Sequence, residues 1–182
     1  MPPSPLTAYL DESIDSDSGL YVLAAREVRP AARQKLIDAL PIRRRPHWHA
    51  EDQPTRAKLV AATAGLPLEA RAYGCRFGSP RRMEAARARA LTWLVFELDV
   101  EIRTLILDRR DAVQDAKDRR LLAPLFRRRP GVEYGHVPSA SEPLLWVADV
   151  VAGAMLATWL NRQDHVTGGL DAVLSRCERE PG

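Results

Sequence analysis

Hydrophobic positions along the chain fall into two patterns. Short apolar runs bounded by turn residues predict strands, and apolar residues at helical spacing, with Pro, Ser or Gly near the ends, predict helices. The predicted strands cover 6–11, 20–28, 67–77, 101–108 and 131–137. The predicted helices cover about 30–40, 55–64, 79–98, 111–123 and 142–160. Ser79 and Ser141 are the predicted N-caps of the third and the last of these helices.

The order of these elements predicts the fold class. Two strands come first, joined by an acidic turn at 12–19, which suggests an antiparallel pair; strands and helices alternate afterwards. The segment HWHAE at 47–51 is predicted to be short and extended. No linker divides the chain, so we predict a single α/β domain over 1–182, a mixed central sheet of about five strands flanked by helices. Residues 161–182 are expected to form a C-terminal extension, a loop with at most one short helix.

Composition narrows the class of protein. With 46% apolar and 28% charged residues the chain is globular, and two cysteines exclude a disulfide scaffold and a cysteine-rich zinc site. The apolar run 144–160 is interrupted by Asp149 and is shorter than the roughly 20 residues of a membrane span. The N-terminal residues lack a signal-peptide pattern. We therefore expect a cytoplasmic protein outside the membrane, whose Leu- and Trp-rich last helix offers a face for a homodimer.

The net charge of +3 comes from a chain rich in arginine. Arginine forks bind phosphate oxygens, so arginine runs are candidate contacts for a nucleic-acid backbone. The alternative is that such runs are solvated faces. The candidates are Arg43, Arg44, Arg45, Arg81 and Arg82.

Asp149 is the most informative acidic residue, because it lies inside the apolar stretch LLWVADVVAGAML. Its helical neighbours three and four positions away offer no partner. An unpaired buried carboxylate costs several kcal/mol, so a cation, a basic side chain or hydrogen-bond donors must come from elsewhere in the fold. The small residues around it allow another backbone segment to pack closely. A buried Asp–Arg pair or a solvent-facing position is the alternative.

Two further aspartates stand at the ends of predicted strands. Alternation along the first strand puts Tyr9 and Asp11 on one face and Leu10 and Glu12 on the other. Asp108 ends the strand RTLILD, where sites gather in open α/β sheets. Asp11 could instead belong to a capped acidic turn, and Asp108 could cap the next helix.

The segment HWHAE places two histidines and an acid at alternate positions. If it is extended, His47, His49 and Glu51 point the same way, which is typical of a metal site or of a base beside an acid. Surface histidines in a loop are the alternative. No glycine-rich nucleotide loop and no GxSxG elbow is present, and nothing in the sequence marks Ser13 as a nucleophile.

Two segments together resemble a large bacterial family of unknown function. These are AYLDES followed by LYVLAA, and the late PSASEPLLWVADVVAGA. Members of that family begin with a strand ending in Asp-Glu-Ser-Gly and end with a helix carrying Gln-Leu-Ala-Asp. The chain departs from this pattern in having Ile14 in place of the glycine and Trp146 in place of the glutamine.

The resemblance implies a ribonuclease H-like fold and a metal-dependent nuclease. By position, Asp11 matches the first-strand acid and Asp149 the acid of the last helix, while Glu51 and Asp108 match more loosely. Two divalent ions need three or four converging carboxylates, and Mg²⁺ or Mn²⁺ accepts oxygen ligands without Cys or His.

The leading hypothesis is a Mg²⁺- or Mn²⁺-dependent nuclease or phosphodiesterase acting on nucleic acid. Asp11 and Asp149 would bind the metal, Asp108 and Glu51 would complete the site, and His49 would carry protons. The first alternative is a non-catalytic module of the same fold that binds nucleic acid or a protein. The second is a hydrolase that holds a transition metal through HWHAE.

Overall fold

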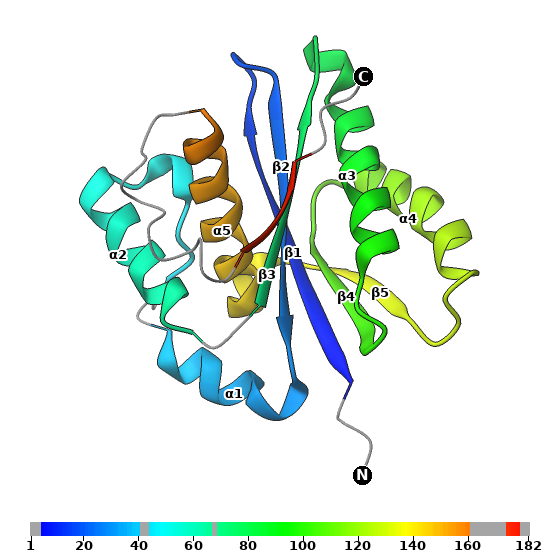
Figure 1. The fold of residues 1–182 in the computed structure, drawn as a ribbon, viewed down its shortest axis with the longest axis horizontal. Helices are drawn as coiled ribbons and strands as arrows, with labels where there is room; N and C mark the ends of the chain where they lie inside the picture. Colours follow the sequence, from blue (N-terminus) through cyan, green and yellow to red (C-terminus); the bar gives the residue numbers. More distant parts are fainter. Residues whose placement is uncertain (1–4, 41–43, 67–68, 161–173, 179–182) are drawn as a thin grey trace.

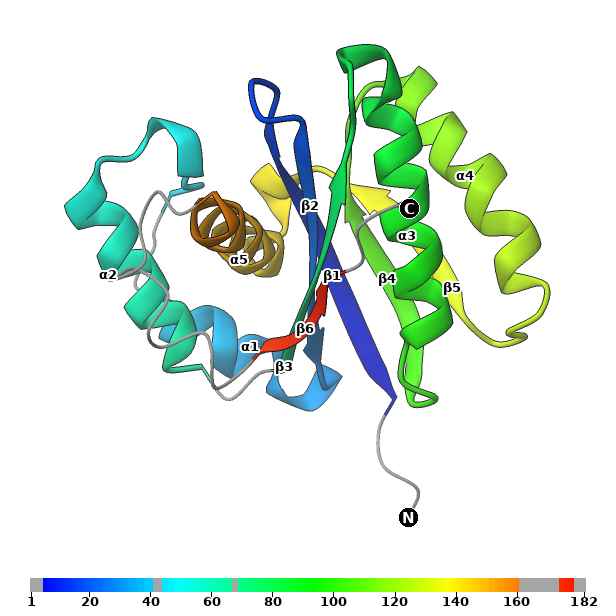
Figure 2. The same ribbon diagram turned by 45° about the horizontal axis from the view of Figure 1, so that its top comes forward.

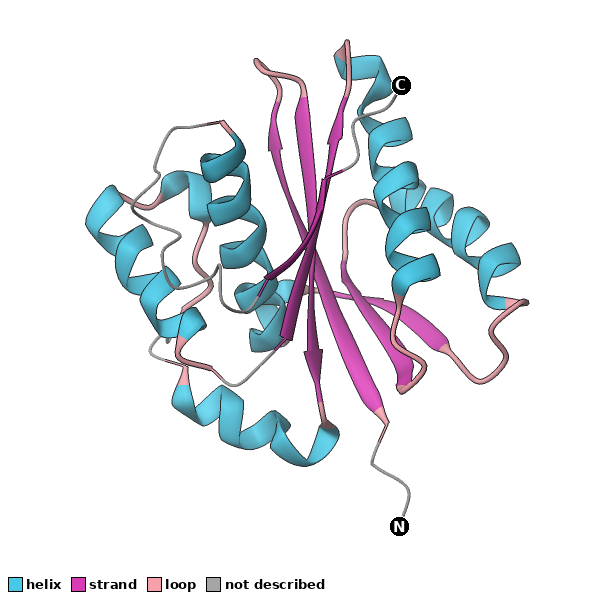
Figure 3. Ribbon diagram, viewed as in Figure 1, coloured by secondary structure: helices cyan, strands magenta, loops and turns pink. Residues whose placement is uncertain are grey.

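A six-stranded sheet organises the computed structural model, with the strand order β5-β4-β1-β2-β3-β6 (Figures 1 and 3). The structure describes residues 5–40, 44–66, 69–160 and the backbone of 174–178. The strands are β1 (Leu6–Asp15), β2 (Leu20–Val28), β3 (Glu69–Arg76), β4 (Ile102–Asp108), β5 (Glu133–Val137) and β6 (Leu174–Glu178). The helices are α1 (Pro30–Ala39), η1 (Trp48–Ala50), α2 (Gln53–Ala64), η2 (Pro80–Arg82), α3 (Met83–Glu97), α4 (Ala112–Phe126), η3 (Ser139–Ser141) and α5 (Pro143–Trp159), of which η1, η2 and η3 are 3₁₀ turns.

The sheet is mixed, as its element order predicts. β1, β2 and β3 form an antiparallel meander, whereas β4 is parallel to β1, β5 to β4 and β6 to β3. β1 is longer than predicted: it runs to Asp15, which pairs with Leu20, so the turn comprises only 16–19. The strand can continue through the acidic stretch because its polar side chains are paired on both faces of the sheet: Glu12 with Arg87 on one face, and Ser13 with His49 on the other.

Helices cover both faces of the sheet (Figure 2). α3 and α4 lie on one face, and α1, α2 and α5 on the other. The alternation along β1 is confirmed: Leu10 packs with the α3 side, and Tyr9 packs with α5. α5 is buried over most of its length, which explains why its sequence is apolar on every side.

Four local predictions are wrong. The segment HWHAE forms the 3₁₀ turn η1 rather than an extended segment. Residues 174–178 form β6 on the edge of the sheet, where a loop or a helix was expected. Ser79 and Ser141 do not cap helices with their side chains; Glu142 caps α5 instead. α4 continues through Pro124 to Phe126.

Within the described ranges, no helix is both long and apolar enough to cross a membrane. The apolar surface of α5, which suggested a homodimer, is covered by the protein's own sheet and helices. The argument for a dimer from this helix therefore no longer holds.

Candidate functional site

Three aspartates from separate elements come together on the α5 face of the sheet. Leu10 of β1 lies opposite Leu107 of the neighbouring parallel strand β4. Asp11 and Asp108 are the next residues of these two strands and therefore lie side by side. α5 packs across β1 and carries Asp149. The three carboxylates lie within electrostatic reach of one another: burial first, and then the charges of Asp149 and Asp108, raise the pKa of Asp11 well above its ordinary value.

Asp149 receives compensation from outside its own helix, as its sequence context required. A backbone N–H of Trp48 donates a hydrogen bond to the carboxylate, and Arg45 attracts it electrostatically. Burial nevertheless outweighs both and raises the pKa of Asp149 to about 6. Gly153 makes the close approach of Trp48 feasible, because a Cβ there would lie 2.1 Å from Cγ of the indole.

Asp108 is held by both charged and neutral donors. The backbone N–H of Ser139 donates to Oδ1 at 2.8 Å, and Arg45 forms an ion pair with Oδ2 at 3.2 Å. The indole Nε1–H of Trp146 donates to the carbonyl of Ser139 at 2.6 Å. Trp146, which replaces the glutamine of the resembling family, thus supports the turn that binds Asp108.

Ser13 and His49 form a pair that sequence reasoning missed. Ser13 lies two residues beyond Asp11 on the same face of β1, and its Oγ is 2.9 Å from Nε2 of His49. Burial, and then the charge of Arg56, lower the pKa of His49 despite the opposing effect of Asp15. The imidazole is therefore neutral near pH 7. Since η1 reaches β1 only through tertiary packing, no local sequence signal could have indicated this contact.

The remaining residues of HWHAE do not converge with the histidine. The 3₁₀ turn removes the strand alternation that would align His47, His49 and Glu51. Glu51 instead pairs with Arg44 at 3.1 Å. Within the part of the chain that the structure describes, these three residues do not form a compact ligand set. The geometry offers no support for a transition-metal site there.

The arginine candidates divide into two groups. Arg44 and Arg45 bind the carboxylates of Glu51 and Asp108. Arg81 is exposed, and Arg82 lines a cavity at the start of α3. Arg43 lies outside the described residues.

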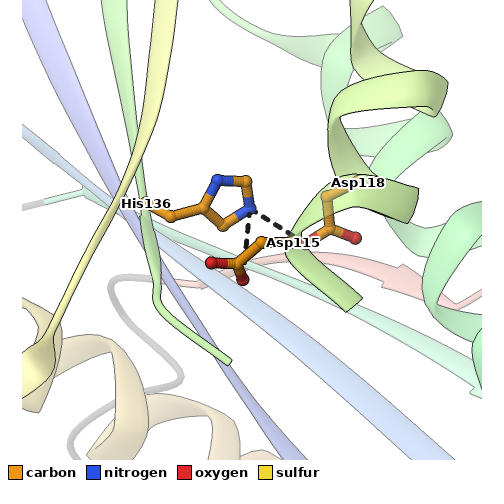
Figure 4. Close-up of side chains that lie close together, drawn as sticks. All are labelled: Asp115, Asp118 and His136. Carbon is orange, nitrogen blue, oxygen red and sulfur yellow. Dashed lines mark hydrogen bonds and ion pairs between the residues drawn. The ribbon is translucent and has the colours of Figure 1, made fainter. Parts of the chain in front are cut away.

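A second group of titratable side chains lies on the opposite face of the sheet. Asp115 and Asp118 of α4 and His136 of β5 place their ligand atoms within 4.8 Å of one another. Figure 4 shows the ring of His136 directed at both carboxylates. Its Nε2 is 3.2 Å from Asp118 and 3.8 Å from Asp115. The three aspartates of the α5 face are spread more widely than this cluster.

Guanidinium groups already occupy this second cluster. Arg87 binds both carboxylate oxygens of Asp118, at 2.8 and 3.0 Å, and Arg110 binds Oδ1 at 3.1 Å. Arg87 also pairs with Glu12, and it donates to the hydroxyl of Tyr21 at 2.7 Å. Burial favours the protonated form of Asp118, but hydrogen bonds from His136 and Arg87 lower its pKa below the ordinary value. A cation would have to displace two arginines, so the cluster is an ion-pair network that ties β1, β2, α3, α4 and β5 together.

Comparison with known proteins identifies the fold of the chain. No family model matches the chain, and no curated protein matches it. Among solved structures, the ribonuclease H2 of Pyrococcus horikoshii superposes with a TM-score of 0.61 over 90% of this chain and 78% of its own, at 13% sequence identity. The ribonuclease H-like architecture implied by the sequence resemblance is therefore confirmed, and the bacterial family stays a prediction. The chain shares its fold with ribonuclease H2.

Proposed function

We propose that the protein is a metal-dependent nuclease that hydrolyses phosphodiester bonds of nucleic acid. The observation that carries this proposal is the meeting of Asp11, Asp108 and Asp149 on one face, with raised pKa values for Asp11 and Asp149. Carboxylates that repel one another in a buried place are poised to bind a cation. The fold shared with a ribonuclease H2 supports this chemistry by analogy.

The donor set fits Mg²⁺ or Mn²⁺. Asp11, Asp108 and Asp149 offer oxygen ligands, which these ions prefer. Two ions about 4 Å apart would need three or four such carboxylates. The ions would supply Lewis-acid stabilisation of charge on the phosphoryl oxygens. Glu51 is the proposed fourth carboxylate, since Trp48 holds η1 against α5.

Other side chains would assist the reaction. His49, neutral near pH 7 and held by Ser13, is proposed to accept or deliver a proton beside the carboxylates. Arg44 and Arg45 would turn from their carboxylates to backbone phosphates when the metal binds. Arg43, Arg81 and Arg82 are proposed as further phosphate contacts, without base specificity and with salt-sensitive affinity.

The decisive experiment is a cleavage assay on labelled single- and double-stranded DNA and RNA with Mg²⁺, Mn²⁺ or EDTA. Wild type is compared with the double variant Asp11→Asn/Asp149→Asn and with Asp38→Asn, which removes an exposed carboxylate on α1. We expect metal-dependent cleavage by wild type and Asp38→Asn, and none by the double variant. Absence of cleavage, together with equal Mn²⁺ affinity in wild type and double variant by calorimetry, would overturn the proposal.

One observation favours the alternative of a non-catalytic binding module. Arg45 forms an ion pair with Asp108, so a guanidinium already supplies positive charge where a metal would bind. Under this alternative the aspartates and Trp146 only stabilise the fold. The same assay separates the two functions, because a binding module retains oligonucleotide affinity in EDTA and cleaves nothing.

A further inference from the structure

A cavity of about 530 Å³ lies away from the three aspartates, at the end of the sheet where the β1–β2 hairpin turns. Its walls are the hairpin, the end of β3 and the first turns of α3; Figure 1 shows these segments together at one end of the sheet. Three arginines line it, Arg76, Arg82 and Arg89, and the described residues of its wall include no acid. The charged side chains that line the cavity are therefore all positive.

The spacing of side chains at the start of α3 creates this hollow. Arg82 and Arg89 are seven residues apart and so lie on one face, two helical turns from each other. Ala85 and Ala86 lie between them and leave the space open. The guanidiniums of Arg82 and Arg89 make no ion pair or hydrogen bond with any described side chain or carbonyl, in contrast to the paired arginines of the interior.

The hairpin contributes a hydroxyl that lacks a partner. Ser18 Oγ is buried and has no hydrogen-bond partner within the described ranges, while its backbone N–H is already bound by Asp15 at 2.8 Å. An unsatisfied buried hydroxyl costs roughly 1–3 kcal/mol, which a ligand in the cavity would offset. The wall around it is fixed: Phe77 N–H donates to the carbonyl of Gly19 at 2.7 Å, and Gly19 has the positive φ of 65° that this turn requires.

We propose that this cavity binds a phosphate group. Two exposed guanidinium forks line this half-open cavity and the buried hydroxyl of Ser18 lies in its wall, and the tetrahedral dianion has acceptor oxygens in enough directions to meet these donors. The positive lining favours an anion over a neutral polar ligand. The phosphate could belong to a nucleic-acid strand or to a small phosphorylated molecule, and the two sources differ in the measurement that detects them. The site shares Arg82 with the phosphate contacts proposed for the nuclease, but it requires neither the three aspartates nor a metal ion.

The test uses the full chain in EDTA, so that no cleavage occurs. Binding of pyrophosphate is measured by calorimetry, and binding of a labelled 20-nucleotide strand by fluorescence anisotropy, for wild type, Arg82→Gln/Arg89→Gln and Ser18→Ala. The matched control is Arg119→Gln/Arg120→Gln, which removes the same charge from an exposed part of α4. Circular dichroism checks that each variant is folded.

We expect the cavity double variant to lose at least about tenfold in affinity and Ser18→Ala to lose severalfold, with the control close to wild type. If the cavity double variant loses affinity for pyrophosphate, a small phosphorylated molecule is enough to occupy the site. Loss with the oligonucleotide alone assigns the site to a strand. Equal losses in the cavity and control variants, or no binding of either probe by wild type, would overturn the proposal. Cleavage by the aspartates is measured separately, so failure of one proposal leaves the other intact.

Discussion

At the scale of single residues, the interior holds charged groups of two kinds. Arg87 and Asp118 satisfy each other with several hydrogen bonds. Asp149 and Arg26 do not find full compensation. Nε and Nη1 of Arg26 meet no partner within the described part of the chain, and burial lowers the pKa of this fully buried guanidinium to about 10. Of these two incompletely paired groups, only Asp149 lies near other carboxylates, those of Asp11 and Asp108, which is why the proposed metal site is placed there.

Asp149→Asn is expected to stabilise the metal-free protein at pH 7. The native pKa of Asp149 is about 6 and lies above the unfolded value, so the native state holds the proton longer and stability falls as pH rises from about 4 through 6. Removing the charge should add up to about 3 kcal/mol to the free energy of unfolding. The gain should vanish below pH 4, where the wild-type carboxyl is protonated. Urea unfolding in EDTA at both pH values measures it, and a loss of stability at pH 7 would contradict the raised pKa.

Arg45→Ala is expected to raise the affinity for Mn²⁺ and to lower the affinity for an oligonucleotide. Mn²⁺ affinity should increase by about tenfold, because a positive charge near Asp108 and Asp149 is removed. Oligonucleotide affinity should decrease if the same guanidinium contacts phosphate. Calorimetry and anisotropy, with Arg120→Ala as the control, separate these effects. Weaker Mn²⁺ binding in Arg45→Ala would show that the arginine supports the site rather than competing with the metal.

At the scale of elements, the site depends on how η1 packs against α5. The indole of Trp48 packs directly against Gly153. The Nε–H of Arg56 in α2 donates a hydrogen bond to the carbonyl of Trp48 at 2.9 Å, and the Arg56 guanidinium lies 5.3 Å from the centroid of the indole ring. The short turn is thereby fixed between two helices. This brings the Trp48 N–H to Asp149 and His49 to Ser13.

Gly153→Ala is expected to displace η1 and to impair the site. The new methyl group would lie 2.1 Å from Cγ of Trp48, so the indole must move, at a cost of about 1–3 kcal/mol. Gly135→Ala on β5 is the control, since a Cβ at that position would meet no atom within 4 Å. Thermal unfolding, tryptophan fluorescence and Mn²⁺ affinity should change in Gly153→Ala and not in the control. Unchanged fluorescence would refute this account of the packing.

At the scale of the whole molecule, the two faces of the sheet differ in how completely their charged side chains are paired. On the α5 face, the acids Asp11, Asp108 and Asp149 are incompletely paired. On the α3–α4 face, an ion-pair network connects β1, β2, α3, α4 and β5. β1 serves both faces at once, with Asp11 on one side and Glu12 on the other. Stability and proposed chemistry thus share one central strand.

Arg87→Met is expected to destabilise the whole fold. It leaves Asp118 and Glu12 as buried or half-buried charges without their main partner, a loss of about 3–5 kcal/mol for a broken buried pair. Arg120→Met on the exposed side of α4 should change stability by less than about 0.5 kcal/mol. Chemical unfolding at pH 7 measures both. An unchanged midpoint for Arg87→Met would mean that the network contributes no net stability.

The sequence determined the local elements and their order, because apolar periodicity, proline and glycine act over a few residues. It therefore sufficed for the mixed sheet, for the faces of β1 and for Asp149 as an acid, half-buried in the structure, that needs compensation from outside its helix. Residues 174–178 were missed as a strand because an edge strand depends on the partner it pairs with, here β3. HWHAE was misread because a 3₁₀ turn follows from packing on α2 and α5 rather than from alternation.

Tertiary structure alone decided which charges meet. Asp11, Asp108 and Asp149 are separated by long stretches of sequence, and only the β1–β4 register and the packing of α5 bring them to one face. The same holds for Ser13 with His49, and for Arg44 and Arg45, which pair with acids although their side chains stay exposed. The physical reason is that electrostatic and hydrogen-bonding energies depend on distance in space, whereas the pattern along a chain reports distance only within one element.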